Sequence, residues 1–485
     1  MLFNSFDFAA FLLLVLIGCS VLRNRGQNVW LLLASYTFYG LWDWRFLTLI
    51  AFSTSVDYLV ARRINHLDIR TGEPVKSATN AQRKRWLYLS LLCNLGLLGV
   101  FKYFNFFVDS FVALGAQIGL NLDTPALRLL PPVGISFYTF QSMAYTIDVY
   151  RRELKPERNF ITFALFISYF PQLVAGPIER ASRLLPQFRV QRTVTLDCVK
   201  SGLTLMLIGL FKKVVIADNA GFAVNRIFAD IESQSSATLL AGGILFTLQI
   251  YCDFSGYSNM ARGMSRLLGI RLVENFKTPY LSANISEFWR RWHISLSQWL
   301  RDYLYIPLGG SRGGERRTYR NLMLTMLLGG LWHGAAWTFV IWGVLNGLYL
   351  AVHRWWQGRF RARLLADTPR PLLIRALLWV FGAALTYFCV MLAFIVFRAE
   401  SLSDAIAYLQ GIVAFRGDLV LKNYMLIGLL GLLLLPLELI QYTNNDRLLA
   451  VRSLVLPIRS SLYAMMIISL LLASSTDIPF IYFQF

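Results

Sequence analysis

Two of the four histidines lie where an imidazole could carry out acid–base chemistry. His333 follows about eleven residues of a run, from Leu322 to Val352, that contains no Asp, Glu, Lys or Arg. In a helix that rises about 1.5 Å per residue, this position is about 16 Å deep, near the middle of a bilayer. Histidine is the usual acid–base group near neutral pH, and its neutral form buries no permanent charge at such a depth. A structural histidine that bonds a neighbouring helix is the alternative.

The residues around His333 predict a crowded pocket. Gly330 and Gly334 are four residues apart, and glycines at this spacing let a neighbouring backbone approach closely. Trp332 and Trp337 supply bulk on either side of the histidine. The pattern therefore favours a histidine that faces protein or a wet cavity rather than lipid.

His293 belongs to a second pattern, in a segment rich in both arginine and tryptophan. Asn284 followed by Glu287 is typical of a capping box, which predicts that a helix begins there. The residues that then fall at helical spacing on one predicted face are Trp289, Trp292, His293, Leu296, Leu300 and Tyr303. A histidine on an apolar face is more often a satisfied core group than a ligand, so both interpretations of His293 stay open.

Further polar side chains recur along two apolar runs. Gln249, Asp253 and Tyr257 are spaced four residues apart, so they share one helix face. A carboxylate in such a place needs a partner, either a proton or an arginine. The earlier run has a similar stripe, which consists of Tyr138, Gln141, Tyr145 and Asp148. Both stripes are compatible with structural bracing and with the lining of an active site.

Other chemistries find no support in the sequence. It has no Gly-rich phosphate loop followed by Lys-Ser/Thr, no Gly-x-Ser-x-Gly elbow and no His-Glu-x-x-His pair. The five cysteines are scattered and show neither a disulfide framework nor a metal-ligand spacing, so we predict no metal site. Cys252 could be imagined as a nucleophile, but no basic group is evident in the sequence to lower its pKa.

The elements that must position these residues are membrane-spanning helices. Hydrophobic residues make up 56% of the 485 residues and charged residues only 15%, which excludes an ordinary water-soluble fold. We predict an all-α polytopic membrane protein, a single domain over residues 1–485, with about eleven or twelve spans. The predicted spans lie near residues 7–22, 28–42, 46–61, 86–108, 133–150, 159–175, 200–217, 237–260, 322–352, 372–396, 424–441 and 459–474.

The net charge of +20 and a motif near the N-terminus each admit another interpretation. A basic soluble protein would suggest nucleic acid, but no basic stretch carries a recognisable reading motif. Membrane proteins gather Lys and Arg in cytoplasmic loops, so we expect contact with anionic lipid and none with nucleic acid. The run Leu16–Cys19 resembles a lipoprotein processing site, yet no Lys or Arg precedes it, so we expect an uncleaved first helix.

The centre of the chain, residues 271–320, departs from the hydrophobic rhythm. Arginines alternate there with large aromatic residues, a composition that suits neither a soluble loop nor an ordinary span. Amphipathic or re-entrant helices at the membrane interface accommodate both kinds of residue. The helical pattern that holds His293 ends at Pro307, and residues 309–314 then predict a flexible, basic loop.

Several of these segments together resemble a known family. They are FPQLVAGPIER at 170–180, DFSGYS at 253–258, FWRRWHISLS at 288–297, RDY at 301–303, YIPLGG at 305–310, LWHGAAW at 331–337 and PFIYFQF at 479–485. The sequence resembles the membrane-bound O-acyltransferase (MBOAT) superfamily, in its bacterial branch of alginate and exopolysaccharide O-acetyltransferases. The resemblance runs the length of the chain, and the blocks around His293 and His333 are the most specific.

The resemblance implies a ring of tilted helices around a central tunnel, with His333 at its midpoint. It implies that acetyl-CoA, or an acyl carrier protein, donates from the cytoplasm and that the acceptor arrives from the outer face of the bacterial inner membrane. His333 would be the general base, and His293 would orient the donor or stabilise charge at the reacting carbonyl. Arginines of the central segment would meet the phosphates of the donor. The other residues expected to contact the donor or line the tunnel are Gln141, Asp253, Tyr257, Trp289, Arg290, Arg291, Trp292, Ser297, Arg301, Asp302, Trp332 and Trp337.

The acceptor polymer and the route to it stay open. Alginate, cellulose or another exopolysaccharide could receive the acetyl group, directly or through a periplasmic relay protein. Within the same superfamily, the chain could instead transfer D-alanine from a carrier protein toward teichoic acid, or acylate a lipid or a protein. A transporter that exports polysaccharide or acetyl groups without covalent chemistry is the alternative from another class.

Overall fold

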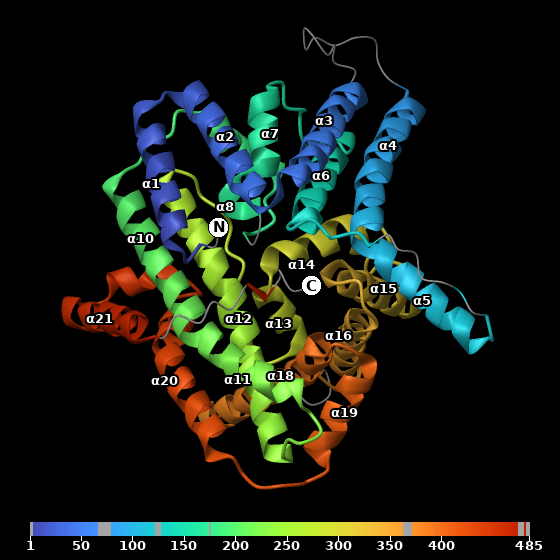
Figure 1. Ribbon diagram of the computed structural model, residues 1–485, viewed down its shortest axis with the longest axis vertical. Helices are drawn as coiled ribbons and strands as arrows, with labels where there is room; N and C mark the ends of the chain where they lie inside the picture. Colours follow the sequence, from blue (N-terminus) through green and yellow to red (C-terminus); the bar gives the residue numbers. More distant parts are fainter. Residues whose placement is uncertain are drawn as a thin grey trace. The chain divides into compact units, whose positions relative to one another are not determined.

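The structure is a computed structural model that describes residues 3–65, 79–120, 122, 128–173, 176–361, 371–473 and 480–481. Throughout these residues the regular secondary structure is helical (Figure 1), which confirms the predicted all-α fold. The chain divides into two compact units. The first unit comprises Met1–Met206 and Met260–Val273, and the second comprises Leu207–Asn259 and Glu274–Phe485.

The first unit is built from the N-terminal helices. They are α1 (Phe6–Val21), α2 (Asn24–Asp43), α3 (Leu47–Ile64), α4 (Asn80–Leu98), α5 (Phe104–Gln117), α6 (Ile135–Tyr150), α7 (Phe160–Ser168), α8 (Phe170–Leu173) and α9 (Ala181–Arg189). Short 3₁₀ and π turns, η1 (Trp44–Phe46) and η2 (Gly99–Tyr103), join some of them. Two helices, α10 (Leu196–Leu210) and α12 (Ser236–Leu267), each continue from one unit into the other.

A buried carboxylate holds three helices of the first unit together. The helices α3, α4 and α6 pack side by side (Figure 1), and Asp57 of α3 is fully buried among them. Its oxygens accept hydrogen bonds from Asn94 Nδ2 at 2.8 Å and Thr146 Oγ1 at 3.3 Å, and also from the hydroxyls of Ser90 and Ser142. All four donors are neutral side chains of α4 and α6, so these hydrogen bonds link α3 to both helices.

The second unit carries the remaining helices. They are η3 (Phe211–Ala217), α11 (Asp218–Ala229), η4 (Pro279–Leu281), α13 (Ile285–Arg291), α14 (Ile294–Leu300), η5 (Arg301–Tyr305), α15 (Glu315–His333), α16 (Trp337–Trp356), η6 (Gln357–Arg361), α18 (Leu372–Arg398), α19 (Leu402–Val413), α20 (Leu421–Thr443), η7 (Leu448–Ser453) and α21 (Leu456–Leu472). The loop predicted for residues 309–314 is confirmed, since turns and bends separate η5 from α15.

Within the described part of the chain, four helical stretches are long and apolar enough to cross a membrane. They are Asn80–Gln117, Ser236–Leu267, Leu372–Arg398 and Leu421–Thr443, and each contains one of the predicted spans. Shorter apolar helices occur at Phe6–Val21, Phe160–Leu173, Leu402–Val413 and Leu456–Leu472. Apolar helices of this number and length are what a bilayer requires, so the chain is an all-α, multi-pass membrane protein.

The span predicted at 322–352 is wrong as a single helix. The helix α15 ends at His333 and α16 begins at Trp337, so the histidine terminates a helix instead of lying inside one. Gly334 and Ala336 between them are extended, with φ of −159° and −149°. Because these residues are as apolar as their neighbours, hydropathy cannot detect the break, and counting residues along one helix does not give the depth of His333.

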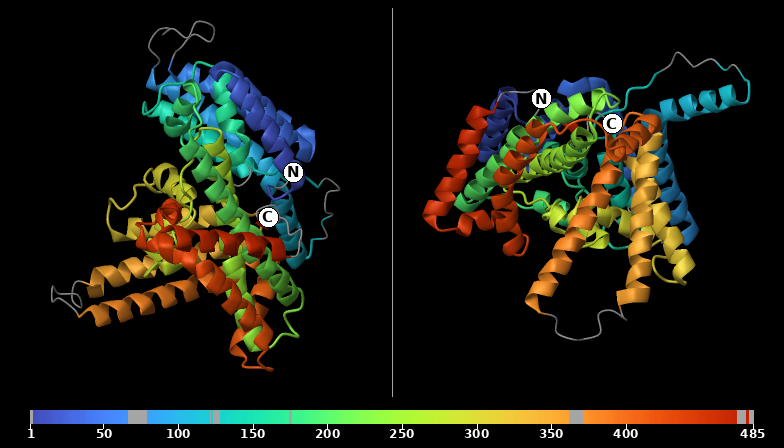
Figure 2. Two further views of the ribbon diagram at one scale, coloured as in Figure 1. Left: turned by 90° about the vertical axis from the view of Figure 1, so that its left-hand side faces the viewer. Right: turned by 90° about the horizontal axis from the view of Figure 1, so that it is seen from below.

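The two helices at this break pack closely because glycines face them. A Cβ at Gly330 would lie 2.2 Å from the carbonyl oxygen of Phe339, and one at Gly334 would lie 2.0 Å from its ring. The predicted close approach of a neighbouring backbone is therefore confirmed, with α16 as the neighbour. In turn α16 runs against α18 (Figure 2), where the ring centroids of Phe339 and Phe397 are 4.8 Å apart.

Candidate active site

His333 closes α15 inside an aromatic box formed by Trp332, Trp342 and Phe397. The ring centroids of Trp342, Trp332 and Phe397 lie 4.9, 5.0 and 5.5 Å from that of the imidazole, each at a steep angle to it. Only 5% of His333 is exposed. The box therefore restricts both the orientation of the imidazole and its access to bulk water.

His293 lies at a break between two short helices. The helix α13 ends at Arg291 and α14 begins at Ile294, while Trp292 is extended and His293 is left-handed, with φ of +40°. The continuous amphipathic helix predicted through this segment, with one face from Trp289 onward, is therefore wrong. The predicted helix start is confirmed, since Asn284 Oδ1 accepts the N–H of Glu287 at 3.0 Å.

Backbone hydrogen bonds to another segment replace the helical ones at this break. The N–H of Lys277 donates to the carbonyl of Arg291 at 2.9 Å, and the N–H of Ile294 donates to the carbonyl of Asn275 at 2.9 Å. These bonds lie on both sides of His293 and offset a left-handed backbone that costs a residue other than glycine roughly 1–3 kcal/mol. Spacing within the sequence cannot reveal such a tertiary constraint, which is why the helix was predicted to continue.

The structure brings the two histidines together, although they are 40 positions apart in the sequence. Their ring centroids are 6.5 Å apart, and the ring of Trp332 lies 5.9 Å from His293. The ring centroid of Phe254, a residue of α12, lies 4.7 Å from that of His293, with the two rings steeply inclined. Burial lowers the pKa of His293 to about 3, because the imidazolium would lose its hydration, so this ring is neutral at physiological pH.

Asp253 forms a buried ion cluster that was predicted only in part. Its Oδ1 lies 2.9 Å from Lys213 Nζ, and the same ammonium lies 2.8 Å from Asp218 Oδ1. The charged partner is thus a lysine and not the predicted arginine. Its Oδ2 accepts the N–H of Ile481 at 2.6 Å. Asp253 therefore anchors the segment at Phe480 and Ile481 beside α12.

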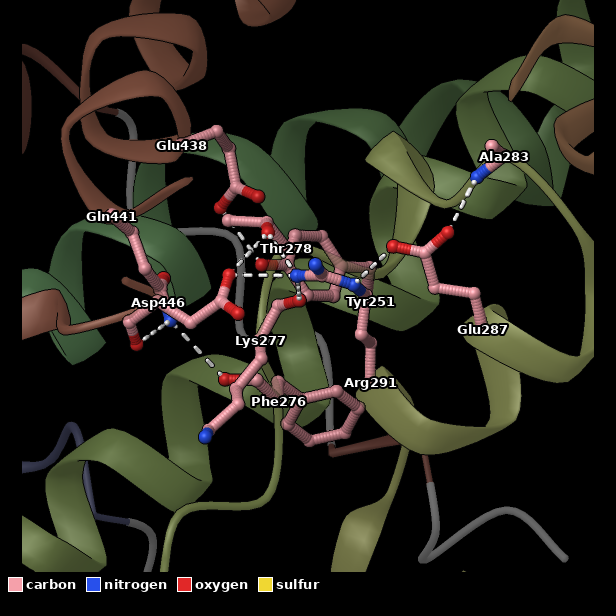
Figure 3. A network of polar contacts seen from close by, with 10 residues as sticks. All are labelled: Tyr251, Phe276, Lys277, Thr278, Ala283, Glu287, Arg291, Glu438, Gln441 and Asp446. Carbon is pink, nitrogen blue, oxygen red and sulfur yellow. Dashed lines mark hydrogen bonds and ion pairs between the residues drawn. The ribbon is translucent and has the colours of Figure 1, made fainter. Parts of the chain in front are cut away.

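Arg291 belongs to a polar network that fixes the segment following Asn275 (Figure 3). Its guanidinium contacts Glu287 at 2.9 Å and Asp446 at 2.7 Å, and it donates to the carbonyl of Lys277 at 3.1 Å. Gln441 Nε2 donates to the carbonyl of Phe276 at 3.3 Å. Two carboxylates already balance the charge of Arg291, so its position suits bracing better than contact with donor phosphates.

The other residues of the central segment differ in exposure. Arg290 is exposed, and Arg301 forms an exposed ion pair with Asp302 at 2.7 Å, so these side chains are accessible to a ligand. Ser297 Oγ donates to the carbonyl of Trp292 at 3.2 Å, which ties the start of α14 to the break. Trp289 and Trp292 are buried.

Three other residues were predicted to contact the donor or line the tunnel, and none of them is one of the three residues that form the aromatic box. Trp337 is 54% exposed at the start of α16. Tyr257 is buried on α12, where its ring lies 4.2 Å from that of Phe480. Gln141 belongs to the first unit, where its Nε2 donates to the carbonyl of Phe166 and its Oε1 accepts from Gln172 at 3.0 Å. Of the motif residues, 174–175, 479 and 482–485 lie outside the described residues.

Sequence reasoning missed several residues of the site. Trp342 and Phe397 complete the aromatic box, but nothing in their spacing relative to His333 singles them out. Lys213 could have been found, because a lysine inside a predicted span needs a buried partner. Asn275 could not, because its relation to His293 depends on the tertiary bonds described above.

Comparison with known proteins finds a matching family and several relatives. The model of the MBOAT, membrane-bound O-acyltransferase family matches residues 150–395, which include both histidines. A probable alginate O-acetylase of Azotobacter vinelandii is 44% identical over 87% of this chain and 80% of the relative. A peptidoglycan O-acetyltransferase of Helicobacter pylori is 37% identical over 86% of this chain and 80% of the relative. A teichoic acid D-alanyltransferase of Streptococcus thermophilus is 28% identical over 60% of this chain and 75% of the relative.

Proposed function

Because this chain belongs to the membrane-bound O-acyltransferase family and is therefore an O-acyltransferase, we propose that it moves an acetyl group from acetyl-CoA to hydroxyl groups of a polysaccharide outside the membrane. The observation that carries the proposal is the pair of buried histidines, His293 and His333, which come from separate elements and lie 6.5 Å apart. A small acyl group held beside them could contact both rings.

The proposed reaction gives each histidine one task. The acceptor hydroxyl oxygen attacks the thioester carbonyl carbon while His333 takes the hydroxyl proton, the carbon–sulfur bond then breaks, and the thiolate leaves and recovers that proton. Proton transfer by a positioned base contributes about 10²–10⁴-fold to such reactions. The neutral ring of His293 would orient the acyl group or stabilise the negative charge that develops on its oxygen.

Exposed arginines of the central segment support an anionic donor. Arg290 and Arg301 are exposed, as are Arg312, Arg316 and Arg317 around the start of α15. Guanidinium groups bind phosphate oxygens through paired hydrogen bonds, which suits the phosphates of coenzyme A. The same surface would suit an acidic carrier protein, the donor in the second candidate function, D-alanyl transfer. The lower identity of the D-alanyltransferase relative favours acetyl transfer.

We infer the class of acceptor from the names of the relatives. Proteins that are 44% and 37% identical to the chain are named for alginate and for peptidoglycan acetylation, and both polymers carry sugar hydroxyls. We place the protein in a bacterial inner membrane, with the donor on the cytoplasmic side. The acetyl group would reach the polymer either directly or through a periplasmic relay protein.

The test supplies the purified full-length chain in lipid nanodiscs with acetyl-CoA labelled in its acetyl group, with and without alginate. The proposal predicts release of free thiol and label in the polymer. A parallel reaction with a D-alanyl-loaded carrier protein separates the second candidate. Reaction with the loaded carrier alone would contradict acetyl transfer, and if neither thioester were cleaved, a transporter would become the better account.

A further inference from the structure

Asn275 presents a buried amide whose orientation is fixed. Only 1% of the residue is exposed. Its Oδ1 accepts the backbone N–H of Ser295 at 3.1 Å and the hydroxyl of the same residue at 2.8 Å. A backbone N–H can only donate, so the atom that faces it must be the oxygen, and the NH₂ group of Asn275 must point the other way.

That NH₂ group has no protein acceptor among the described residues. Leaving a buried donor unsatisfied costs about 1–3 kcal/mol, and proteins seldom tolerate it without a reason. Other buried asparagines show the ordinary arrangement, since Asn346 Nδ2 donates to the carbonyl of Trp342 at 2.9 Å and Asn321 Nδ2 to that of Gly310 at 3.0 Å. Asn275 therefore has a buried NH₂ group without a protein acceptor, whereas the NH₂ groups of Asn346 and Asn321 each have one.

The segment that carries this donor is rigidly mounted next to His293. The carbonyl of Asn275 accepts the N–H of Ile294, and its side-chain oxygen accepts the N–H of Ser295. Asn275 thus fixes the two residues that follow His293. The next residues, Phe276 and Lys277, are held through their carbonyls by Gln441 and Arg291 (Figure 3). A donor fixed on both sides need not reorganise when a ligand arrives, which is what makes such groups effective toward developing charge.

We propose that Asn275 Nδ2 donates a hydrogen bond to the carbonyl oxygen of the acyl group during transfer. This inference rests on the proposed function, because it assigns a donor to the same reaction. When the acceptor oxygen attacks, the carbonyl π electrons move to its oxygen, and the amide NH₂ stabilises that oxyanion without giving up its proton. The electron pair on the oxyanion re-forms the carbonyl π bond as the carbon–sulfur bond breaks, and the negative charge leaves on the thiolate sulfur, so Asn275 is unchanged by the reaction.

The alternative is a structural asparagine that only holds Ser295. Asn275→Ala removes both the donor and the acceptor, whereas Asn275→Asp keeps an oxygen for Ser295 and removes the NH₂ group. Asn346→Ala is the matched control, because it deletes a buried asparagine of α16 whose NH₂ is satisfied by its own helix. The assay is thiol release from acetyl-CoA by the full-length chain in nanodiscs, with kcat and KM determined separately.

The proposal predicts that Asn275→Ala lowers kcat about 10²–10³-fold with little change in KM, the loss seen when one oxyanion donor is removed. Asn346→Ala should retain kcat. Should Asn275→Ala not fold, Asn275→Asp decides, because a carboxyl can donate only when protonated and its kcat must then fall as pH rises relative to wild type. A kcat equal to that of the wild type in folded Asn275→Ala, or in Asn275→Asp at every pH, would overturn the proposal. Absence of thiol release from the wild type would refute the proposed function instead.

Discussion

Two buried polar clusters show how differently this chain treats groups that it removes from water. In the first unit, Asp57 receives four neutral side-chain donors. In the second unit, the NH₂ group of Asn275 and the indole N–H groups of Trp289 and of Trp342 in α16 have no protein acceptor among the described residues. The first cluster is complete as a bond between helices. The second has donors that a ligand oxygen could accept from.

This contrast separates two uses of buried polarity. A saturated group stabilises the fold, because every donor and acceptor lost from water is replaced. Unsatisfied donors near two histidines lower stability, and a ligand oxygen that accepted their hydrogen bonds would recover that loss. We therefore expect substitutions in the two clusters to act on different quantities: stability for the saturated one, and turnover for the open one.

We expect the largest effect on stability at the buried cluster of Lys213, Asp218 and Asp253, in which charged groups pair with one another. Lys213→Met leaves Asp253 and Asp218 buried without their cation, which costs about 3–5 kcal/mol. Thermal unfolding in detergent, followed by tryptophan fluorescence, measures the loss. Lys200→Met, at an exposed position, is the control and should change stability by less than about 0.5 kcal/mol. Equal stability of the two variants would show that the cluster does not bear on folding.

The next effect is on turnover. His293→Ala removes a neutral imidazole from the reacting group, and we expect thiol release to slow about 10²–10³-fold while the protein stays folded. Loss of folding without a change in the kcat of the remaining folded protein would instead place His293 with the structural cluster. Comparing kcat with the melting temperature of the same preparation distinguishes the two outcomes.

Asp57→Asn should lower stability and leave turnover unchanged. In the variant an NH₂ group replaces one of the two acceptor oxygens and faces groups that themselves donate. At least one buried hydrogen bond is therefore lost, at about 1–3 kcal/mol. The kcat of the folded fraction should stay at the wild-type value. A fall in kcat at unchanged stability would contradict the distinction between the clusters.

The smallest effect concerns Glu179, a buried carboxyl whose Oε1 accepts the backbone N–H of Val273. Burial raises the pKa of Glu179 to about 7 from an ordinary value of 4.5. The folded chain therefore holds a proton that the unfolded chain releases between pH 4.5 and 7, so this group makes the protein less stable as the pH rises through that range.

Glu179→Gln should flatten this dependence while keeping an oxygen for the N–H of Val273, its partner in the wild type. Melting temperatures recorded between about pH 5 and 8 measure the change, which should amount to a few degrees at most. A variant whose melting temperature varied with pH as steeply as that of the wild type would remove Glu179 as the source.

The apolar runs predicted the helices well, because a bilayer imposes its own length on them. The run at 237–260 became α12 and the run at 372–396 became α18, with ends displaced by a few residues. The same signal failed at 322–352, where three apolar residues leave the helix without changing the hydropathy. Hydropathy reports the environment of a segment and says little about its backbone.

The candidate site was predictable where one residue type determines the chemistry. His293 and His333 were identified by their blocks, and the structure places them side by side. Their surroundings were not predictable, because the left-handed backbone of His293 depends on bonds to residues 275 and 277. The role expected for Arg291 changed for a similar reason, since Asp446, which contacts it, is 155 residues away in the sequence.

The central claim is that an imidazole at the end of α15 takes the acceptor proton in acyl transfer. The most direct measurement compares wild type with His333→Ala, following thiol release and acetyl-CoA binding in one preparation. We predict unchanged binding and melting temperature, with thiol release at least about 10²-fold slower. If His333→Ala cleaved the thioester at the wild-type rate, the histidine would be structural and the proposed chemistry would have to be assigned elsewhere.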